Sequence, residues 1–472
     1  MAQYDFGMIG LGVMGSNLLL NMSDHGFAVI GFDLKPERGK ALEEAAKEGT
    51  TVKGVATITD LVNALKQPRK IMMLVPAGKP VDDVIASLLP LLEEGDIVID
   101  GGNSFYKDTV QRIRFLQDKG LHFMGMGVSG GELGARVGPS MMPGGDQAAY
   151  DYLKPILEAI AAKADGKPCV AFMGNDAAGH YVKMVHNGIE YAMMQMISEV
   201  YDLLHRGAGY TNEQLHALFK KWNKGALQSF LIEVTADIFK TGDDETPGNE
   251  DFLIDAILDQ AGSKGTGKWT SQEAMNLPVA IPTIDMAVAM RNLSVYKEDR
   301  KKVAHLYQPA IEPITMDAAE LEMHTEAALH FCFVIAYAQG LAMLAKASTE
   351  LKMAIPLPQV IQVWKAGCII RSAMLPTFEK AFVANDTLPN LLLDKGVVAL
   401  LQNDEQSLRK IIAAGVTAKI PVAGISSALA YFDAYCSERL PTNLIQAQRD
   451  YFGAHTYQRI DKPGVFHTEW NV

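Results

Sequence analysis

Short apolar runs alternate with helical segments through about the first 175 residues of the chain. Each run is short and rich in Val, Ile, Phe and Met, as expected for strands that are buried on both faces. Strands that alternate with helices form βαβ units, and these require a parallel sheet with helices packed on it. We therefore expect a doubly wound parallel sheet. The expected strands are 4–9, 28–32, 71–75, 97–100 and 123–128, and the crossover helices begin near Gly12, Pro36, Pro80 and Lys107.

The sequence changes character beyond Gly174. From about residue 176 to residue 435 it shows amphipathic helical stretches and no alternation of period two, which predicts an all-α region. A chain of 472 residues also exceeds what one hydrophobic core normally holds. We therefore expect a Rossmann-type domain over 1–176, a large all-helical domain over 177–435 and a C-terminal tail over 436–472.

The tail contains several prolines and glycines and is predicted to be irregular. It is nevertheless too aromatic for a disordered end, since it carries Phe452, Tyr457, Phe466 and Trp470. We expect it to pack against another surface, and a partner subunit is one candidate.

Composition excludes several classes of partner. The net charge of −12 argues against a nucleic acid or an anionic membrane surface. The N-terminus lacks the features of a signal peptide, and the most apolar segment, 331–344, is interrupted by Gln339 and too short to span a bilayer. The four cysteines show no zinc-type spacing and are expected to be reduced, buried thiols. We expect a cytoplasmic protein.

A glycine-rich motif lies between the first expected strand and the first expected helix. Its first glycine permits a tight turn, the second lets the backbone approach a pyrophosphate, and the third packs the helix on the strand. The free N–H groups of the helix N-terminus would then face the phosphates. The expected dinucleotide ligands in this motif are Gly10, Leu11, Gly12, Val13, Met14 and Gly15.

The second expected strand is followed by Asp33, Leu34 and Lys35. An acidic residue here accepts hydrogen bonds from the adenosine ribose hydroxyls and repels a 2′-phosphate, so Asp33 favours NAD over NADP. Lys35 favours NADP instead, because it could reach a 2′-phosphate. The cofactor is therefore expected to be NAD or NADP, with NAD favoured.

Four polar residues share one face of a helix that should otherwise be buried. Lys183, His186, Asn187 and Glu190 stand at positions i, i+3, i+4 and i+7, among flanking Val, Met and Ile residues. Acid–base machinery is one reason for such a stripe; a solvated pair and a core histidine are the alternatives. His186 and Glu190 at i, i+4 could also bind a metal, but no third ligand lies nearby in the sequence.

Two further glycine-rich loops, 100–104 and 128–131, follow expected strands. The carboxyl ends of strands are where open α/β sheets bind ligands, so both loops can reach the nicotinamide and a substrate. Plain turn chemistry is the alternative for each loop taken alone.

The segment 262–269, GSKGTGKW, matches the P-loop pattern GxxxxGK as far as Lys268. The next residue is Trp269 rather than the Ser or Thr that holds magnesium, and the segment follows helical sequence rather than a strand. ATP hydrolysis is therefore excluded. Lys264, Thr266 and the backbone N–H groups of the loop are still suited to a substrate phosphate.

Seven motifs follow one another along the chain: GLGVMG, DGGNS, GVSGGE, GPSMMPGG, KMVHNGIEY, GSKGTGKWT and LIQAQRDYFGAHTY. In this order and spacing they resemble 6-phosphogluconate dehydrogenase of the long, decarboxylating type, over essentially the whole chain. The resemblance implies oxidative decarboxylation of 6-phospho-D-gluconate to D-ribulose 5-phosphate and CO₂, a step of the pentose phosphate pathway, with reduction of NAD or NADP. It also implies a homodimer.

The resemblance assigns roles to individual residues. Lys183 would be the general base that takes the proton of the substrate's C3 hydroxyl and, once protonated, polarises the C3 carbonyl for loss of CO₂. Glu190 would be the acid that protonates C1 of the resulting enediol. The other implied substrate ligands are Asn103, Ser129, Gly130, Gly131, His186, Asn187, Tyr191, Lys264, Thr266, Arg291, Arg449 and His455.

Within this set, the turn at 129–131 would bind the substrate carboxylate, and His186 and Asn187 its hydroxyls. Asn103 would lie between the substrate and the coenzyme. The implied phosphate cradle comprises Tyr191, Lys264, Thr266 and Arg291, with Arg449 and His455 added from the tail of a second subunit.

A lysine that acts as a base must be neutral at the working pH. We therefore expect burial or a neighbouring cation to hold the pKa of Lys183 well below about 10.4. A protonated lysine can also polarise a carbonyl, as a metal ion does in other oxidative decarboxylases, and we expect no metal site.

The chain departs from the family pattern in two places. Asp33, Leu34 and Lys35 replace the common Asn-Arg-Thr, and Val75-Pro76-Ala77-Gly78 replaces the common Val-Lys-Ala-Gly. Both changes remove a cation near the nucleotide and should weaken NADP binding. Val75, Pro76 and Ala77 are still expected to contact the cofactor.

Two other functions remain open at this point. A related β-hydroxyacid dehydrogenase of the 3-hydroxyisobutyrate type would share the fold and the lysine, although such enzymes are typically shorter. A non-catalytic NAD(P)-sensing dimer would have lost its catalytic groups, whereas Lys183 and Glu190 are both present.

Overall fold

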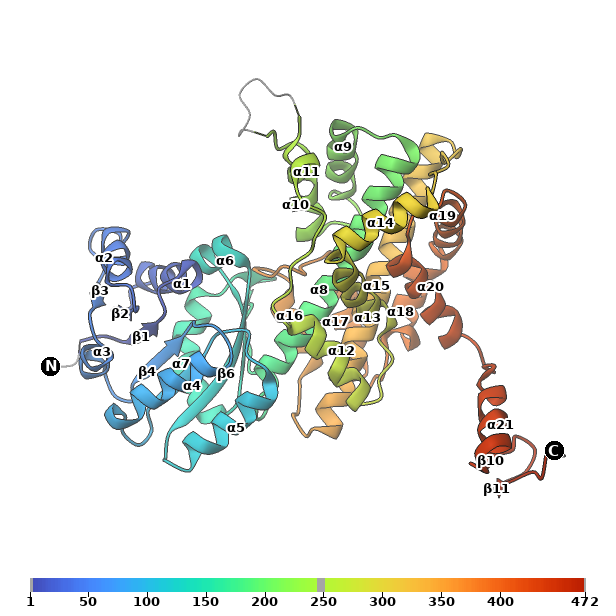
Figure 1. Ribbon diagram of the computed structural model, residues 1–472. Coiled ribbons are helices and arrows are strands. Elements are labelled where there is room, and N and C mark those ends of the chain that lie inside the picture. The colour runs from blue at the N-terminus through green and yellow to red at the C-terminus, as the bar shows by residue number, and fades with distance from the viewer. Residues whose placement is uncertain (1–2, 244–250, 471–472) are drawn as a thin grey trace.

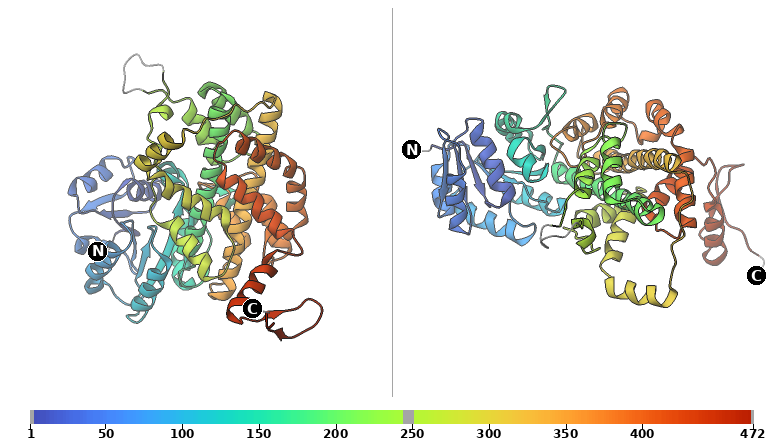
Figure 2. Two further views of the ribbon diagram at one scale, coloured as in Figure 1. Left: turned by 45° about the vertical axis from the view of Figure 1, so that its right-hand side comes forward. Right: turned by 90° about the horizontal axis from the view of Figure 1, so that it is seen from above.

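The computed structural model describes residues 3–243 and 251–470. It shows an N-terminal α/β domain beside a larger helical domain, with a C-terminal segment that projects away from both (Figure 1). The other two views show the same arrangement (Figure 2).

The N-terminal domain is built on a seven-stranded sheet with the strand order β3-β2-β1-β4-β5-β6-β7. All neighbouring pairs are parallel except β6 and β7, which are antiparallel. The sheet is therefore parallel and doubly wound as predicted, with one antiparallel strand, β7, added at its edge. The strands are β1 (Phe6–Ile9), β2 (Val29–Phe32), β3 (Val52–Val55), β4 (Lys70–Met73), β5 (Ile97–Asp100), β6 (His122–Ser129) and β7 (Ser140–Gly144).

Two of these strands, β3 and β7, were not predicted. β3 is only half-buried and lacks the continuous apolar run of a central strand. β7 contains Pro143, which weakens any strand prediction and is tolerated here at the edge of the sheet.

Helices cover both faces of the sheet (Figure 1). Successive strand residues point to opposite faces, so Met8 joins one buried apolar cluster and its neighbour Ile9 joins the other. The helices are α1 (Val13–Asp24), α2 (Pro36–Glu44), α3 (Ile58–Ala64), α4 (Lys79–Leu88), α5 (Tyr106–Gln117), α6 (Gly131–Val137) and α7 (Gln147–Ile160), with a short 3₁₀ turn η1 (Leu89–Leu91) and a hairpin of β8 (Lys163–Ala164) and β9 (Lys167–Pro168).

The second domain is helical, and its buried apolar residues form one large cluster around α8 (Ala178–Asp202) and α15 (Ala318–Glu350). A π-helical turn, η2 (Leu203–Gly207), continues α8. The other helices are α9 (Asn212–Trp222), α10 (Phe230–Phe239), α11 (Leu253–Ala256), α12 (Thr266–Asn276), α13 (Pro282–Ser294), α14 (Lys297–Tyr307), α16 (Leu357–Trp364), α17 (Leu375–Ala384), η3 (Leu391–Leu393), α18 (Lys395–Gln402), α19 (Glu405–Thr417) and α20 (Ala423–Tyr435).

Helix α15 has 33 residues, so the expectation that its apolar segment is too short to span a bilayer is wrong on length. However, 89% of its most apolar window is buried inside the protein, as in the core helix of a soluble protein. Its burial, rather than its length, is what identifies it as a core element.

Helix α8 meets the sheet at glycines. A Cβ atom on Gly127 of β6 would lie 2.4 Å from Cβ of Lys183, and one on Gly144 of β7 would lie 2.2 Å from the backbone nitrogen of Gly179. Neither position has room for a side chain, so the first turns of α8 touch the backbone of both strands. This close approach places Lys183 beside the carboxyl end of β6.

The C-terminal tail contains a helix, α21 (Thr442–Gly453), and an antiparallel pair of short strands, β10 (Tyr457–Gln458) and β11 (Val465–Phe466). The expectation of an irregular tail is therefore wrong for this part. Pro441 and Gly453, which suggested irregular structure, instead mark the two ends of the helix. Of the four cysteines, all are free, and Cys436 at the start of the tail is exposed rather than buried as expected.

Candidate functional site

Two adjoining cavities lie where the strands of the sheet end and the helical domain begins. The one above the glycine-rich motif, here called the coenzyme cleft, has a volume of about 550 Å³. The other, here called the substrate cavity, has a volume of about 640 Å³. Met14, Asn103, Val128 and Lys264 line both, so the two spaces share a wall.

The coenzyme cleft is lined by Gly12, Val13, Gly15, Val75, Pro76 and Ala77 in addition to the shared residues. Gly10 and Leu11 are not among its lining residues. Gly10 has φ of +95°, and a Cβ on it would lie 2.5 Å from the carbonyl oxygen of Leu74. A Cβ on Gly15 would lie 2.0 Å from the Gly10 oxygen. Only glycine fits these two positions, as expected for the tight turn and for the packing of helix on strand. A Cβ on Gly12 would meet no atom within 4 Å, so this glycine leaves open space beside the cleft that it lines.

Asp33 lies at the end of β2 and is fixed by neighbouring backbone groups. Its Oδ2 accepts the N–H of Leu11 at 2.7 Å, and its Oδ1 accepts the N–H of Lys35 at 2.9 Å. Burial opposes ionisation of this carboxyl, but these bonds and the Arg38 guanidinium at 3.1 Å lower its pKa. Leu34, which follows Asp33, is uncharged and 90% exposed, so it offers neither a cation nor a buried contact.

Arg38 is a neighbour of this site that the sequence did not single out. It stands in the first turn of α2, five residues beyond Asp33, and no motif covers it. A cation in the first turn of the helix that follows the acidic residue is the signal that could have found it.

The loop after β5 is shaped by Asp100. Its fully buried carboxylate accepts the Gly102 N–H at 3.0 Å and the Ser104 hydroxyl at 2.6 Å, which closes a tight turn. Asn103, at the tip of this turn, lines both cavities as expected for a residue between substrate and coenzyme.

The polar stripe of α8 is one connected group. Lys183 Nζ lies 3.3 Å from His186 Nδ1, which is 2.9 Å from Asn187 Oδ1. The other ring nitrogen, Nε2, lies 3.2 Å from Ser129 Oγ. Glu190 Oε2 lies 3.7 Å from His186 Nδ1. The stripe is therefore joined to the carboxyl end of β6.

Lys183, Asn187 and Glu190 line the substrate cavity, whereas His186 does not. His186 is fully buried behind them, and Cys368 Sγ lies 3.0 Å from its Nε2. This cysteine comes from the segment after α16, almost two hundred residues along the chain, and no sequence motif marks it. His186 thus lies where it can orient Lys183 and Ser129 rather than in the open cavity.

Burial shifts the two facing groups of the stripe in opposite directions. It lowers the pKa of Lys183, an effect that the nearby Glu190 carboxylate partly opposes. It raises the pKa of Glu190, opposed by Lys183 and Arg291. Burial and the Lys183 charge hold the pKa of His186 well below its usual value. Both pKa values are therefore shifted toward neutral pH, which favours a neutral amine on Lys183 and a protonated carboxyl on Glu190. The shift of Lys183 has the expected direction.

The predicted phosphate residues Tyr191, Lys264, Thr266 and Arg291 are all found at the substrate cavity. They line it together with the 129–131 turn. The Arg291 guanidinium lies 3.5 Å from the centre of the Tyr191 ring, and Thr266 Oγ1 accepts a hydrogen bond from Asn187 at 3.2 Å. The cations and the helix stripe thus belong to one connected wall.

Arg449 and His455 are predicted site residues that belong to neither domain. Both are in the tail, which projects away from the two domains, and neither lines the coenzyme cleft or the substrate cavity (Figure 1).

Two family models together cover nearly all of the chain. The NAD binding domain of 6-phosphogluconate dehydrogenase matches residues 5–174, and the C-terminal domain of 6-phosphogluconate dehydrogenase matches residues 179–470. The chain belongs to the 6-phosphogluconate dehydrogenase family. The resemblance recognised from the motifs is thereby confirmed.

Relatives in the family match over the full length. The decarboxylating 6-phosphogluconate dehydrogenase of Lactococcus lactis is 48% identical over 474 residues, which cover 100% of this chain and 99% of that protein. The NADP(+)-dependent decarboxylating enzyme of Bacillus subtilis is 48% identical over 471 residues, with 100% of both chains covered. The Plasmodium falciparum 6-phosphogluconate dehydrogenase, solved in apo form and with NADP+ or 6-phosphogluconate, has a TM-score of 0.94 at 44% identity, covering 99% of this chain and 100% of that one.

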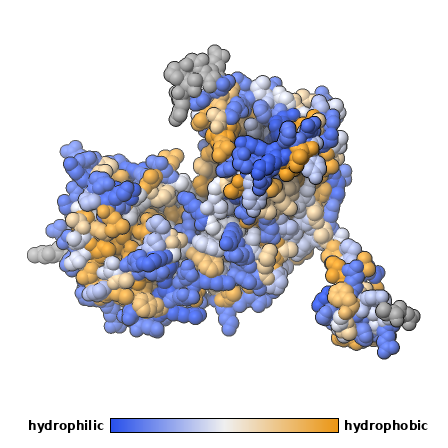
Figure 3. All heavy atoms as spheres, viewed as in Figure 1, coloured by the Kyte–Doolittle hydropathy of each residue, from blue (hydrophilic) through white to orange (hydrophobic). Residues whose placement is uncertain are grey.

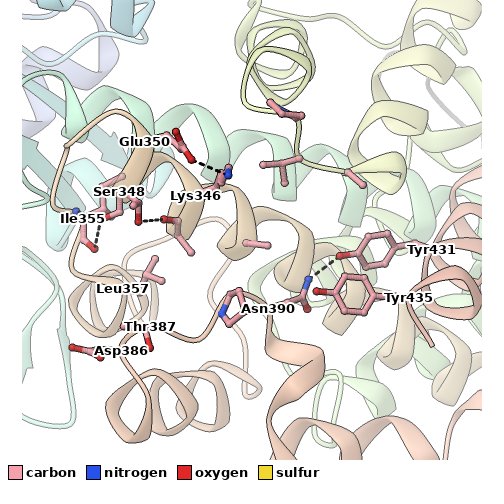
Figure 4. Close-up of a pocket in the computed structure, with 17 residues that line it drawn as sticks. Lys346, Ser348, Glu350, Ile355, Leu357, Asp386, Thr387, Asn390, Tyr431 and Tyr435 are labelled. Atoms are coloured by element: carbon pink, nitrogen blue, oxygen red, sulfur yellow. Dashed lines mark hydrogen bonds and ion pairs between the residues drawn. The ribbon is translucent and has the colours of Figure 1, made fainter. Parts of the chain in front are cut away.

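Among residues 3–243 and 251–470, no group of three or more His, Cys, Asp or Glu side chains is arranged to hold a metal ion. A further cavity of about 550 Å³ lies in the helical domain, away from the family motifs. Figure 4 shows its wall, where Asn390 donates a hydrogen bond to Tyr431 and Lys346 pairs with Glu350.

Proposed function

We propose that this protein catalyses the oxidative decarboxylation of 6-phospho-D-gluconate to D-ribulose 5-phosphate and CO₂ with reduction of NAD(P)+. The observation that carries the proposal is the pairing of Lys183 and Glu190 in one cavity, with pKa values that burial shifts in opposite directions. Groups shifted apart in this way divide into a base and an acid. Membership of the family supports the same reaction.

In the proposed reaction, the neutral amine of Lys183 takes the proton of the C3 hydroxyl as the C3–H bond breaks. Bound NAD(P)+ supplies the acceptor for the hydride that leaves C3. The protonated Lys183 then donates a hydrogen bond to the new C3 carbonyl oxygen, which draws in the electron pair of the C1–C2 bond as CO₂ leaves. Glu190 donates its proton to the carbon of the enediol that becomes C1 of ribulose 5-phosphate.

The turn at 129–131 suits the substrate carboxylate, because Gly130 and Gly131 have φ of +117° and +63° and present backbone to the cavity. Lys264 and Arg291, which line the same cavity, suit the phosphate, together with Tyr191 and Thr266. The two anionic ends of one substrate would then hold C1 to C3 below Lys183 and Glu190.

We further propose that two chains form a homodimer in which the tail of each chain brings Arg449 and His455 to the phosphate of the other. The tail exposes apolar side chains over its helix, which argues for a partner surface. Figure 3 shows apolar residues on the outside of the tail. The exposed apolar residues of α21 are Leu444, Ile445, Tyr451 and Phe452.

The substrate is tested with a pair of lysine variants and a pair of substrates. Lys264→Met should raise the KM for 6-phosphogluconate about tenfold, because a hydrogen bond to a charged group is lost. The same change should leave the much slower turnover of unphosphorylated gluconate unaltered. Lys268→Met is the matched control, since Lys268 is exposed four residues further along and lines neither cavity.

Steady-state kinetics of wild type and both variants with both substrates decide the matter. Better turnover of gluconate or 3-hydroxyisobutyrate than of 6-phosphogluconate by wild type would contradict the proposal and favour a β-hydroxyacid dehydrogenase. Negligible turnover of all three would favour a sensing role.

We propose that the coenzyme is NAD in preference to NADP. The supporting observations are the fixed carboxylate of Asp33, the exposed Leu34 in place of a cation, and the ion pair of Arg38 with Asp33.

Steady-state kinetics should give a lower KM for NAD than for NADP, and Arg38→Met should change neither KM strongly. A tenfold preference for NADP in kcat/KM that disappears in Arg38→Met would contradict this and assign the 2′-phosphate to Arg38. If the preference for NADP disappeared in Lys35→Met but not in Arg38→Met, Lys35 would be the residue that binds the 2′-phosphate.

We also propose a cytoplasmic location, consistent with four free cysteines.

A further inference from the structure

The tail has an unusual centre. Asp450 is the one buried residue of α21, and none of its atoms is exposed to solvent. The apolar residues of the same helix point outward instead. No apolar residue of α21 is buried, and the contact between the rings of Tyr451 and Trp470, whose centroids lie 5.9 Å apart, leaves Tyr451 exposed. Polar contacts must therefore contribute to holding the helix against the strand pair.

Hydrogen bonds to Asp450 supply that connection. Its Oδ1 accepts the backbone N–H of Thr456 at 2.9 Å and lies 2.9 Å from His467 Nδ1. Its Oδ2 accepts the backbone N–H of Thr468 at 3.0 Å and Nε1–H of Trp470 at 3.0 Å. One donor precedes β10 and three follow β11, so a single carboxylate ties the end of α21 to both strands.

The position is otherwise unfavourable for a carboxylate. Asp450 stands in the last turn of α21, where the helix dipole disfavours negative charge, and burying an anion is costly without partners. Burial therefore opposes its ionisation, but the four hydrogen bonds outweigh it and lower the pKa of Asp450 to about 2. Asp450 thus remains ionised at neutral pH, and its bonds persist there.

Arg449 and His455 lie on either side of this centre. Arg449 precedes Asp450 in the helix, where its Nη1 donates to Gln446 Oε1 at 3.1 Å. His455 sits in the turn between Ala454 and Thr456, which both have positive φ, of 48° and 60°. The Thr456 N–H that closes this turn is one of the donors to Asp450. The turn that presents His455 is therefore held closed by Asp450.

We propose that Asp450 is the positioning residue of the tail, folding the helix and strand pair into one unit that presents Arg449 and His455 to a substrate phosphate. This rests on the proposed homodimer in which the tail completes the partner's site. Asp450 itself touches no substrate. Its effect on catalysis is exerted through the placement of two neighbours.

The test compares Asp450→Asn with Asp461→Asn in the full-length protein. The first keeps the size of the side chain but turns one acceptor oxygen into an NH₂ group that faces donors. The second makes the same change in the same tail at an exposed ion pair with Arg459. Trp470→Phe is a milder variant that removes a single donor to Asp450.

Hydrogen exchange should show lost protection at the amides of Thr456 and Thr468 in Asp450→Asn and unchanged protection in Asp461→Asn. The KM for 6-phosphogluconate should rise about tenfold or more in Asp450→Asn, with a smaller rise in Trp470→Phe. The KM for the coenzyme, and the turnover of gluconate, which has no phosphate, should stay as in wild type.

Hydrogen exchange and kinetics each have an outcome that would contradict the proposal. Unchanged amide protection in Asp450→Asn would show that Asp450 does not organise the tail. Lost protection with an unchanged KM for 6-phosphogluconate would show that the tail does not serve the phosphate, while leaving the assigned reaction intact. Absence of 6-phosphogluconate turnover in wild type would instead contradict the proposed function, and the exchange experiment would still report on Asp450.

Discussion

Replacing Lys183 with methionine is expected to lower kcat with 6-phosphogluconate by about three to four orders of magnitude. In the proposed mechanism the amine is the base in the oxidation and the hydrogen-bond donor to the C3 oxygen in the decarboxylation, so its loss would affect two steps. Methionine nearly matches the length of the buried stem, which packs on Gly127, and the fold should be retained. Coenzyme binding, measured by fluorescence titration, should remain within about twofold of wild type because Lys183 does not line the coenzyme cleft.

Lys346→Met is a suitable control for this variant. Lys346 is also a helix lysine, but it pairs with Glu350 far from both cavities, and its loss should leave kcat unchanged. A Lys183→Met protein that retains more than about a tenth of wild-type kcat would show that another group is the base. Equal and negligible reduction of nicotinamide by wild type and Lys183→Met would favour a sensing protein.

Replacing Glu190 with glutamine is expected to lower kcat by about two to three orders of magnitude. The amide keeps the shape of the side chain but cannot deliver a proton to C1, so the enediol should persist after CO₂ has left. Incorporation of solvent deuterium at C1 of ribulose 5-phosphate, measured by NMR, should lose its stereochemical preference in the variant. A kcat within about threefold of wild type would remove Glu190 from the mechanism.

The pH profile gives this prediction a sign. The acid must be protonated and its pKa is raised by burial, so the proton-donating step should slow as pH rises through that pKa. The base must be neutral and its pKa is lowered, so the oxidation should speed up as pH rises through the pKa of Lys183. The E190Q variant should lose the limb that depends on the acid and keep the rising limb. A profile unchanged in shape would contradict the assignment of Glu190.

Local patterns in the sequence predicted much of the fold and most of the cavity residues. The spacing of Lys183, His186, Asn187 and Glu190 reports a helix face directly, because positions three and four apart are neighbours on any α-helix. The glycine-rich motif and the loops after β5 and β6 could be placed because strand ends gather at one edge of a parallel sheet. These inferences need only short-range geometry.

The features that the sequence missed depend on contacts between distant segments. Cys368 reaches His186 from the segment after α16, and only the packed helices bring them together. The antiparallel edge strand β7 pairs through a register that no local period specifies. Asp450 looks like an ordinary polar helix residue in sequence, and its burial depends on the chain that returns after β11.

The glycine contacts between α8 and the sheet have a mechanical consequence. Because Lys183 packs on Gly127 and Gly179 packs on Gly144, the lysine that we propose as the base is held against the same sheet that carries the coenzyme turn. The position of the proposed base relative to the coenzyme turn is thus set by close contact of α8 with the backbone of β6 and β7. The movements that admit substrate and release product are then expected in parts of the cavity lining that do not belong to the sheet or to α8. The segment around Lys264 is one such part.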